Sequence, residues 1–314
     1  MVAKLKDVAD LAGVSVTTVS RVINNYGSLS KKTIAKVHAA MRELNYQPNA
    51  LARAMQGKPS KFIGLIFPNT TNPFFAELIN DLEHRLFSIG YKTIIASSAE
   101  NEQIEHDYLG MLMANQVDGI ISSSHNLGIR EYQQITSTVV SFDRYLAGNI
   151  PIVECDSYHG GQLSAKYVVD HGAKRIAVMI DEDTSVSPTL NRIQGTVDYL
   201  TEHHVNYTPL DAKRVNFTET FPGKYDAVIA NNDVQALEIR NVAKRAGKKI
   251  NEDFVVTGYD GSKIIRTIEP DLPTVVQPID QIADELIKTL MVKIKNPQAV
   301  IEPEQLPVSF HYPE

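Results

Sequence analysis

The stretch LKDVADLAGVSVTTVSRVIN at residues 5–24 contains two short amphipathic helical patterns separated by a tight turn. From Leu5 to Ala12, apolar residues recur at spacings of three and four, which is the pattern of one apolar helix face. Gly13 stands where such a helix ends, and Ser15 can cap the helix that follows. We therefore predict a helix-turn-helix in this stretch.

The second of these helices is predicted to carry a polar outer face. Its outward side chains are short hydrogen-bonding groups and one arginine, which suit base edges and phosphates in a major groove. Residues 1–60 hold nine Lys/Arg and three acidic residues, a net charge of +6, whereas the other 254 residues carry −12. A basic head on an acidic body indicates that the head meets a polyanion. The predicted DNA-contacting residues are Thr17, Thr18, Arg21 and Asn24.

A third helix and a short linker follow. Ser30 can cap a helix whose apolar stripe reaches Leu44, and a purely structural three-helix bundle is an alternative that needs neither the basic charge nor the polar face. Pro48 ends this pattern, and Asn49 can cap the seven residues ALARAMQ at 50–56. Such a short helix is marginal alone, so it is either an ordinary linker or a hinge that needs its twin in a dimer and DNA.

From Lys61 onward, apolar strands alternate with helical stretches, and the pattern restarts near Ile150. This alternation predicts parallel sheets with helices on both faces, and its repetition predicts two similar α/β halves with a cleft between them. We expect a headpiece at 1–47, a hinge helix and linker at 48–59, and an effector-binding and dimerisation body at 60–314, whose subdomains are 60–157 with 279–300 and 158–278 with 301–314.

Polar side chains at the carboxyl ends of the predicted strands are the candidate ligand-binding residues, because ligands of open α/β sheets bind beyond those ends. Carboxylates accept hydrogen bonds from sugar hydroxyls, arginine donates in a fork, and an aromatic ring stacks on C–H groups. For any one of them a helix cap or a loop hydrogen bond is the alternative role. The candidate effector-binding residues are Asn72, Phe74, Ser122, Asp143, Arg192, Asn232, Asp260 and Gln277.

The stretch at 5–24, together with LSKKTIAKVHAAMRELNYQPNALARAMQGK at 29–58, resembles the headpiece of the lactose-repressor/galactose-repressor family. The resemblance implies that Val16, Thr17 and Arg21 read bases. It also implies that a hinge helix, carrying Asn49 and Arg53, enters the minor groove of a pseudo-palindromic operator. Met55 then stands at the apolar wedge position, where most members have leucine.

The blocks NPFFAEL, VDGIISSS, SFDR, NND and GYDG resemble the body of the same family, and NQVDGIISSSHN at 115–126 is most similar to its sucrose-gene repressors. The resemblance implies a periplasmic-binding-protein type of body, a homodimer, and a sugar or sugar-phosphate effector contacted by Asp143, Arg192, Asn232, Asp260 and Gln277. The chain departs from the family between residues 207 and 225, where it is short and lacks the usual helix.

Two other classes of protein fit the sequence less well. Neighbouring carboxylates, Asp181 with Asp183 and Glu100 with Glu102, match a glycosidase pair in composition only, and no GxGxxG, Walker or HExxH motif is present. A transport binding protein shares the expected fold but not the basic head. A single cysteine, no long apolar run and no secretion signal lead us to expect a reduced, cytoplasmic setting without a membrane span, a metal or a cofactor, and the absence of a heptad tail favours a dimer.

Overall fold

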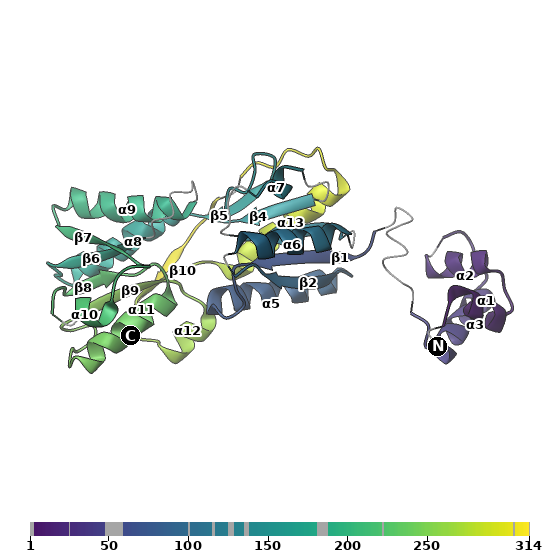
Figure 1. Ribbon diagram of the computed structural model, residues 1–314, viewed down its shortest axis with the longest axis horizontal. Helices are drawn as coiled ribbons and strands as arrows, with labels where there is room; N and C mark the ends of the chain where they lie inside the picture. Colours follow the sequence, from purple (N-terminus) through teal and green to yellow (C-terminus); the bar gives the residue numbers. More distant parts are fainter. Residues whose placement is uncertain are drawn as a thin grey trace. The chain divides into compact units, whose positions relative to one another are not determined.

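The computed structural model describes residues 3–24, 26–47, 59–99, 101–114, 117–124, 129–134, 138–180, 188–221, 223–303 and 305–313. The chain divides into two compact units, residues 1–60 and 61–314, which are described separately (Figure 1). The expected hinge residues Asn49, Arg53 and Met55 lie outside the described residues. No helix in the described ranges combines the length and the apolar character that crossing a membrane requires.

The first unit contains the predicted helix-turn-helix and third helix: α1 Leu5–Ala12, α2 Val16–Ile23 and α3 Lys31–Glu43. Gly13 ends α1 with a φ of 65°, a left-handed conformation that glycine adopts without a steric penalty. The Ser15 and Ser30 hydroxyls cap α2 and α3 by accepting from the amides of Thr18 and Thr33. Small and β-branched side chains fill the core, which allows the helices to cross closely.

The first sheet of the body has the strand order β11-β5-β4-β3-β1-β2, with parallel pairing throughout its described strands. Helices α5 and α13 pack on one face, and α6 and α7 on the other. The elements are β1 Phe62–Phe67, α5 Pro73–Ser88, β2 Lys92–Ser97, α6 Glu102–Ala114, β3 Gly119–Ser122, α7 Glu131–Gln134, β4 Thr138–Phe142, β5 Ile152–Cys155, α13 Ile279–Lys295 and β11 Gln305–Leu306.

The second sheet has the order β12-β10-β9-β8-β6-β7 and is parallel except for β12, which runs antiparallel to β10. Helices α8 and α9 cover one face, and α10, α11 and α12 cover the other. The elements are α8 Ser157–Asp170, β6 Ile176–Ile180, α9 Pro188–Glu202, β7 Tyr207–Asp211, α10 Phe217–Thr220, β8 Ala227–Ile229, α11 Asp233–Arg245, β9 Val255–Asp260, α12 Lys263–Ile268, β10 Thr274–Val276 and β12 Ser309–His311.

The predicted α/β class with parallel sheets is confirmed, and two details differ from the expectation. Residues 301–314 do not all join the second sheet, because Gln305–Leu306 first pairs with β5 in the first sheet. The region 207–225 contains a strand, β7, and the four-residue helix α10. β7 is an edge strand whose side chains are exposed or half-buried, so its sequence lacks the apolar run that marks the other strands.

Helices α8 and α9 approach so closely that a side chain does not fit between them. A Cβ added at Gly161 lies 2.0 Å from the carbonyl oxygen of Arg192 and 2.8 Å from the amide nitrogen of Thr196. The Thr196 hydroxyl also donates to the Gly161 carbonyl at 3.2 Å. This contact fixes the start of α9, from which Arg192 projects.

We therefore expect Gly161→Ala to lower the free energy of unfolding by about 1–3 kcal/mol, because the added methyl group pushes two packed helices apart. Gly110→Ala is the matched control: it also lies within a helix, and its Cβ meets nothing within 4 Å. The control is expected to be neutral or slightly stabilising. Urea denaturation of both variants measures the difference, and equal midpoints contradict the tight crossing.

Candidate DNA-reading helix and effector cleft

The exposed face of α2 consists of three of the predicted DNA-contacting residues. Val16 is 43% exposed although it is apolar, and Thr17 and Arg21 are exposed beside it. The Arg21 carbonyl accepts from the Tyr26 amide at 2.9 Å, whereas the Arg21 guanidinium makes no hydrogen bond or ion pair with any residue in the described ranges. This face therefore presents an apolar group, a hydroxyl and a guanidinium to solvent, a combination suited to thymine methyl groups and guanine edges.

The other two predicted residues of this helix have structural partners. The Thr18 amide donates to the Ser15 hydroxyl, and the two hydroxyls lie 2.9 Å apart. The Asn24 side chain donates to the Ser20 carbonyl at 2.6 Å at the end of the helix. Both residues are half-buried, and their side chains form hydrogen bonds at the two ends of α2.

The candidate effector site lies where the carboxyl ends of the two sheets of the body face each other. Asp143 follows β4 in the first sheet, with a left-handed φ of 56° and its amide bonded to the Val153 carbonyl at 3.0 Å. Arg144 donates from one guanidinium nitrogen to the Asp143 carbonyl at 2.6 Å. The Asp143 side chain is buried, and the strained backbone aims it beyond the strand end.

On the side of the second sheet, the central cation of the candidate site is Arg192 of α9. Its guanidinium carbon lies 3.3 Å from the centre of the Tyr259 ring, and one nitrogen donates to the Asn231 carbonyl at 2.7 Å. The stacked ring and the carbonyl hold the guanidinium in one orientation. Burial raises the pKa values of both Asp143 and Asp260, and the positive charge of Arg192 opposes this rise at both carboxyl groups, with Arg144 also opposing it at Asp143. Carboxyl groups of both sheets are therefore within electrostatic reach of one arginine.

Asp260, at the end of β9, and Gln277, just after β10, form a second group in the cleft. The side-chain amide of Gln277 donates to the Asp260 carboxyl group at 2.9 Å, and the backbone amide of Gln277 donates to the backbone carbonyl of Asp260 at 3.1 Å. Asp233, the first residue of α11, is buried behind them and accepts from the Gly261 amide at 2.8 Å and from the Thr274 hydroxyl. Asp233 thus fixes the turn that carries Asp260.

The carboxyl groups of this cleft are held back from ionisation. Burial raises the pKa of Asp260 to about 8, and the neighbouring Asp233 carboxylate acts in the same direction, whereas Arg192 opposes it. Burial raises the pKa of Asp233 to about 6 against its hydrogen bonds, and burial also raises the pKa of Asp143. The raised pKa favours the protonated form of Asp260, which can both donate to and accept from a polyhydroxylated ligand.

Four of the predicted effector residues have other partners in the structure. Asn72 and Asn232 cap helices α5 and α11 through their side-chain oxygens. Phe74 is 3% exposed in the core of the first sheet, with its ring 5.9 Å from that of Phe142. Ser122 is fully buried and shares a hydrogen bond with Tyr132. The structure therefore brings Asp143, Arg192, Asp260 and Gln277 together and gives the remaining four local roles.

Two residues that the sequence did not single out complete the site. Tyr259 supplies the ring beneath Arg192, and its only signal was its place beside Asp260 in the GYDG block. The side chain of Glu77, on α5 of the first subdomain, accepts from the backbone amide of Lys263 at 2.8 Å. This hydrogen bond joins α5 to the start of α12 in the second subdomain. This hydrogen bond spans the two subdomains on one side of the cleft.

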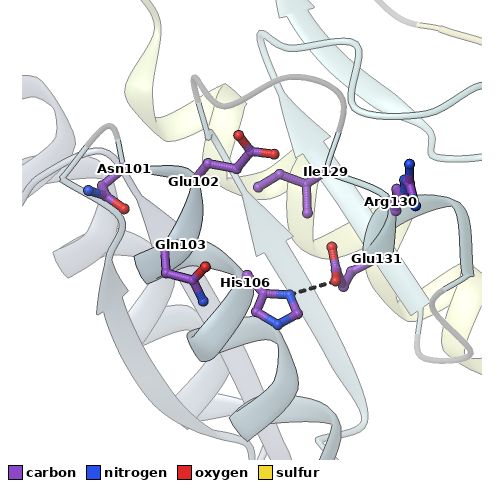
Figure 2. A pocket seen from close by; sticks show the side chains of 7 residues that line it. All are labelled: Asn101, Glu102, Gln103, His106, Ile129, Arg130 and Glu131. Carbon is purple, nitrogen blue, oxygen red and sulfur yellow. Dashed lines mark ion pairs between the residues drawn. The ribbon is translucent and has the colours of Figure 1, made fainter.

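A polar pocket lies between the start of α6 and the start of α7 (Figure 2). Asn101, Glu102 and Gln103 line one side, and Arg130 and Glu131 line the other. His106 and Glu131 form an ion pair at 2.5 Å across it. Glu102 is exposed here, whereas Glu100, Asp181 and Asp183 lie outside the described residues.

These features define a class of protein: a DNA-binding regulator whose head is a helix-turn-helix and whose body is a two-lobed ligand receptor. Comparison with known proteins agrees with this class. Residues 4–49 match the lacI family of bacterial regulatory proteins, and residues 60–311 match the periplasmic binding proteins and sugar binding domain of the LacI family. The chain therefore belongs to the LacI family.

Individual relatives cover nearly the whole chain. The sucrose operon repressor of Pediococcus pentosaceus is 46% identical over 311 residues, which cover 96% of this chain and 95% of that protein. The ribose operon repressor of Bacillus subtilis (strain 168) is 33% identical and covers 98% of this chain and 97% of that protein. The lac repressor dimer bound to operator and the anti-inducer ONPF superimposes with a TM-score of 0.83 at 25% identity, covering 99% of this chain and 98% of that chain.

The family and these relatives confirm the prediction of a sugar-controlled, DNA-binding transcription regulator, and they confirm that the chain is not an enzyme. The expected periplasmic-binding-protein type of body is confirmed by the same matches.

The raised pKa of Asp260 predicts that the stability of the body depends on pH. A carboxyl group that binds its proton more tightly when folded stabilises fully below its unfolded pKa of 3.8, and this contribution is lost as the pH rises through about 8. We expect the melting temperature of the wild type to fall relative to that of Asp260→Asn between pH 5 and pH 8, because asparagine stays neutral and still accepts from Gln277. Parallel melting curves across this range indicate that Asp260 is ionised in the folded protein.

Proposed function

We propose that this protein is the repressor of a sucrose-utilisation operon, which binds a pseudo-palindromic operator as a homodimer in the cytoplasm and responds to sucrose or a phosphorylated sucrose. The observation that carries the proposal is that Asp143 of the first sheet and Asp260 of the second both interact with the charge of Arg192, while Gln277 is hydrogen-bonded to Asp260. A group of carboxyl, amide and guanidinium side chains suits a polyhydroxylated effector.

The choice of sucrose is supported by the order of similarity among relatives. Three relatives named sucrose operon repressors are 42–46% identical over 94–98% of this chain. Relatives named ribose operon repressors are 32–35% identical. The homodimer and the operator are supported by the likeness to the lac repressor dimer bound to operator.

We assign base contacts to Val16, Thr17 and Arg21, with Thr18 and Asn24 as helix-end residues beside them. Effector contacts are assigned to Asp143, Arg192, Asp260 and Gln277. We retain residues 1–47 as the headpiece, 48–59 as the hinge and 60–314 as the body, with the first subdomain now including residues 305–306. The hinge contacts of Asn49, Arg53 and Met55 remain proposals about residues outside the described part of the chain.

Two measurements test this function together. A mobility-shift titration with a palindromic operator-length DNA measures specific binding, and a thermal-shift screen of sucrose, sucrose 6-phosphate, fructose and ribose measures the effector. Stabilisation by a sugar together with its release of the protein from DNA supports a repressor. Binding of a sugar without binding of any DNA at low salt indicates a transport protein instead, and the repressor proposal then fails.

Arg21→Ala is expected to weaken operator binding by about 1–3 kcal/mol, because the exposed guanidinium loses a bidentate contact with a base. Binding to random DNA should change less, and the slope of log K against log salt should fall by about 0.9 if a phosphate contact is lost as well. Arg42→Ala, an exposed arginine in the last turn of α3, is the matched control. Equal losses on operator and random DNA assign Arg21 to the phosphate backbone only.

Asp260→Ala and Arg192→Ala are expected to abolish release by the effector while leaving effector-free operator affinity within about twofold, since both lie in the body and not in the head. Leaving a buried charge unpaired destabilises proteins by about 3–5 kcal/mol, so melting curves of both variants come first. Glu238→Ala, an exposed acid on α11, serves as the control. A folded Asp260→Ala protein with normal release removes Asp260 from the site.

A further inference from the structure

A fully buried carboxyl group lies on the apolar face of α6, away from the effector cleft residues described above. Glu105 has no exposed surface, and it shares its helix face with the buried Leu109 and Leu112. A carboxyl group in such a place is costly unless hydrogen bonds satisfy its oxygens. The partners of Glu105 therefore indicate what the residue does.

Both oxygens of Glu105 accept hydrogen bonds from hydroxyl groups. The Tyr132 hydroxyl of α7 donates to one oxygen at 2.5 Å, and the Ser124 hydroxyl donates to the other. Tyr132 and Ser124 are themselves fully buried. The carboxyl group thus joins three elements inside the first subdomain: helix α6, helix α7 and the segment that follows β3.

The number of hydroxyl protons determines which group donates in the contact between Tyr132 and Ser122. A tyrosine hydroxyl has one proton, and Tyr132 uses it toward Glu105. In the 2.9 Å contact between Ser122 and Tyr132, the serine must therefore donate and the tyrosine accept. The Ser122 oxygen in turn accepts from the Ser124 amide at 3.3 Å. The proton of the Ser122 hydroxyl is committed inside the protein and is not offered to a ligand.

The Ser122–Ser124 segment forms the carboxyl end of β3, at the same sheet edge as Asp143. The amide of Ser123 continues the sheet pairing by donating to the Ile66 carbonyl at 2.9 Å. Ser122 pairs in register with Ser141 of β4, two residues before Asp143. The segment therefore lies beside the strand that leads to Asp143.

We propose that Glu105 is a positioning residue for the effector response, because through Tyr132 and Ser124 it fixes the end of β3 beside the cleft. The proposal rests on the proposed sugar-responsive function. Ser122, expected from sequence to contact the effector, acts within this network instead. The burial of Tyr132 and the nearby Glu105 carboxylate both raise the pKa of the tyrosine, which keeps its hydroxyl protonated and able to donate.

A more exposed pair stands directly beside this buried pair in sequence. His106 and Glu131 form an ion pair at the pocket shown in Figure 2, with side chains 51% and 30% exposed, whereas Glu105 and Tyr132 form their hydrogen bond in the core. Exposed ion pairs contribute little to stability. The buried hydrogen bonds are therefore the stronger connection between α6 and α7, and the exposed pair is a useful comparison.

The first measurement needs no effector. Glu105→Gln keeps the size of the side chain but turns one acceptor into an amide donor, which opposes one of the two donating hydroxyls. Tyr132→Phe removes one hydroxyl only. Hydrogen exchange of the amides at 122–124 in the full-length protein should become about tenfold faster in both variants. Glu83→Gln, an exposed glutamate in the same subdomain, should leave it unchanged.

The second measurement separates positioning from simple destabilisation. Sucrose and sucrose 6-phosphate are titrated against the protein–operator complex. In both variants the midpoint of release should rise about tenfold, while effector-free operator affinity stays within about twofold. The double variant should shift the midpoint no further than the larger single variant, because both changes break the same chain of hydrogen bonds. His106→Ala, at the exposed pair, should have little effect.

The outcomes are distinct. Folded variants with unchanged exchange at 122–124, or with an unchanged midpoint of release, overturn the proposal. Faster exchange throughout the body with an equal loss of operator affinity shows a general structural role and overturns it as well. If Glu105→Gln does not fold, Tyr132→Phe decides by the same criteria. If the wild type binds operator but ignores both sugars, the proposed function fails, and the exchange of residues 122–124 alone then decides whether Glu105 fixes this segment.

Discussion

The cleft of the body depends on one cation, the guanidinium of Arg192, held against the ring of Tyr259. Carboxyl groups from both subdomains are buried around it, and burying charge without compensation is far more costly than any single packing defect. Two effects reduce this cost: Arg192, together with Arg144 at Asp143, stabilises the ionised forms, and burial raises the pKa values of Asp143 and Asp260, which favours their neutral forms. The cleft is thus polar without being strongly charged, which suits a ligand made of hydroxyl groups.

The backbone around this cation is built to hold it in place. The start of α9 is fixed because Gly161 of α8 allows its carbonyl oxygen at Arg192 to approach without a side chain between them. The turn that carries Asp260 is fixed because the buried Asp233 accepts from the Gly261 amide and the Thr274 hydroxyl. An effector can shift the balance between two states only through unequal affinity for them, so contacts that bridge both subdomains matter most. Asp143 and the Glu77–Lys263 hydrogen bond belong to that class.

Most of the fold could be predicted from the sequence because its strands are buried apolar runs and its helices carry local caps. β1 and β4 are almost entirely buried and mostly apolar, and Ser15 and Ser30 cap the helices expected of them. Edge elements were missed for a physical reason: β7 and β11 bury few side chains, so they lack the apolar signal. The assignment of residues 305–306 depends on pairing with a strand about 150 residues earlier, which no local pattern encodes.

The site was harder to predict than the fold, because the position of a residue at a strand end does not show which groups its side chain will hydrogen-bond. Ser122 ends β3 and Asp143 follows β4 in the same sheet, yet Asp143 has a left-handed backbone beyond its strand end and Ser122 gives its only proton to Tyr132. Glu105 is the converse case: an acid on the face that carries Leu109 and Leu112 breaks the apolar pattern of α6. Such a break is a usable signal, since a buried carboxyl group is retained only where partners from other elements satisfy it, and those partners lead to the edge of the cleft.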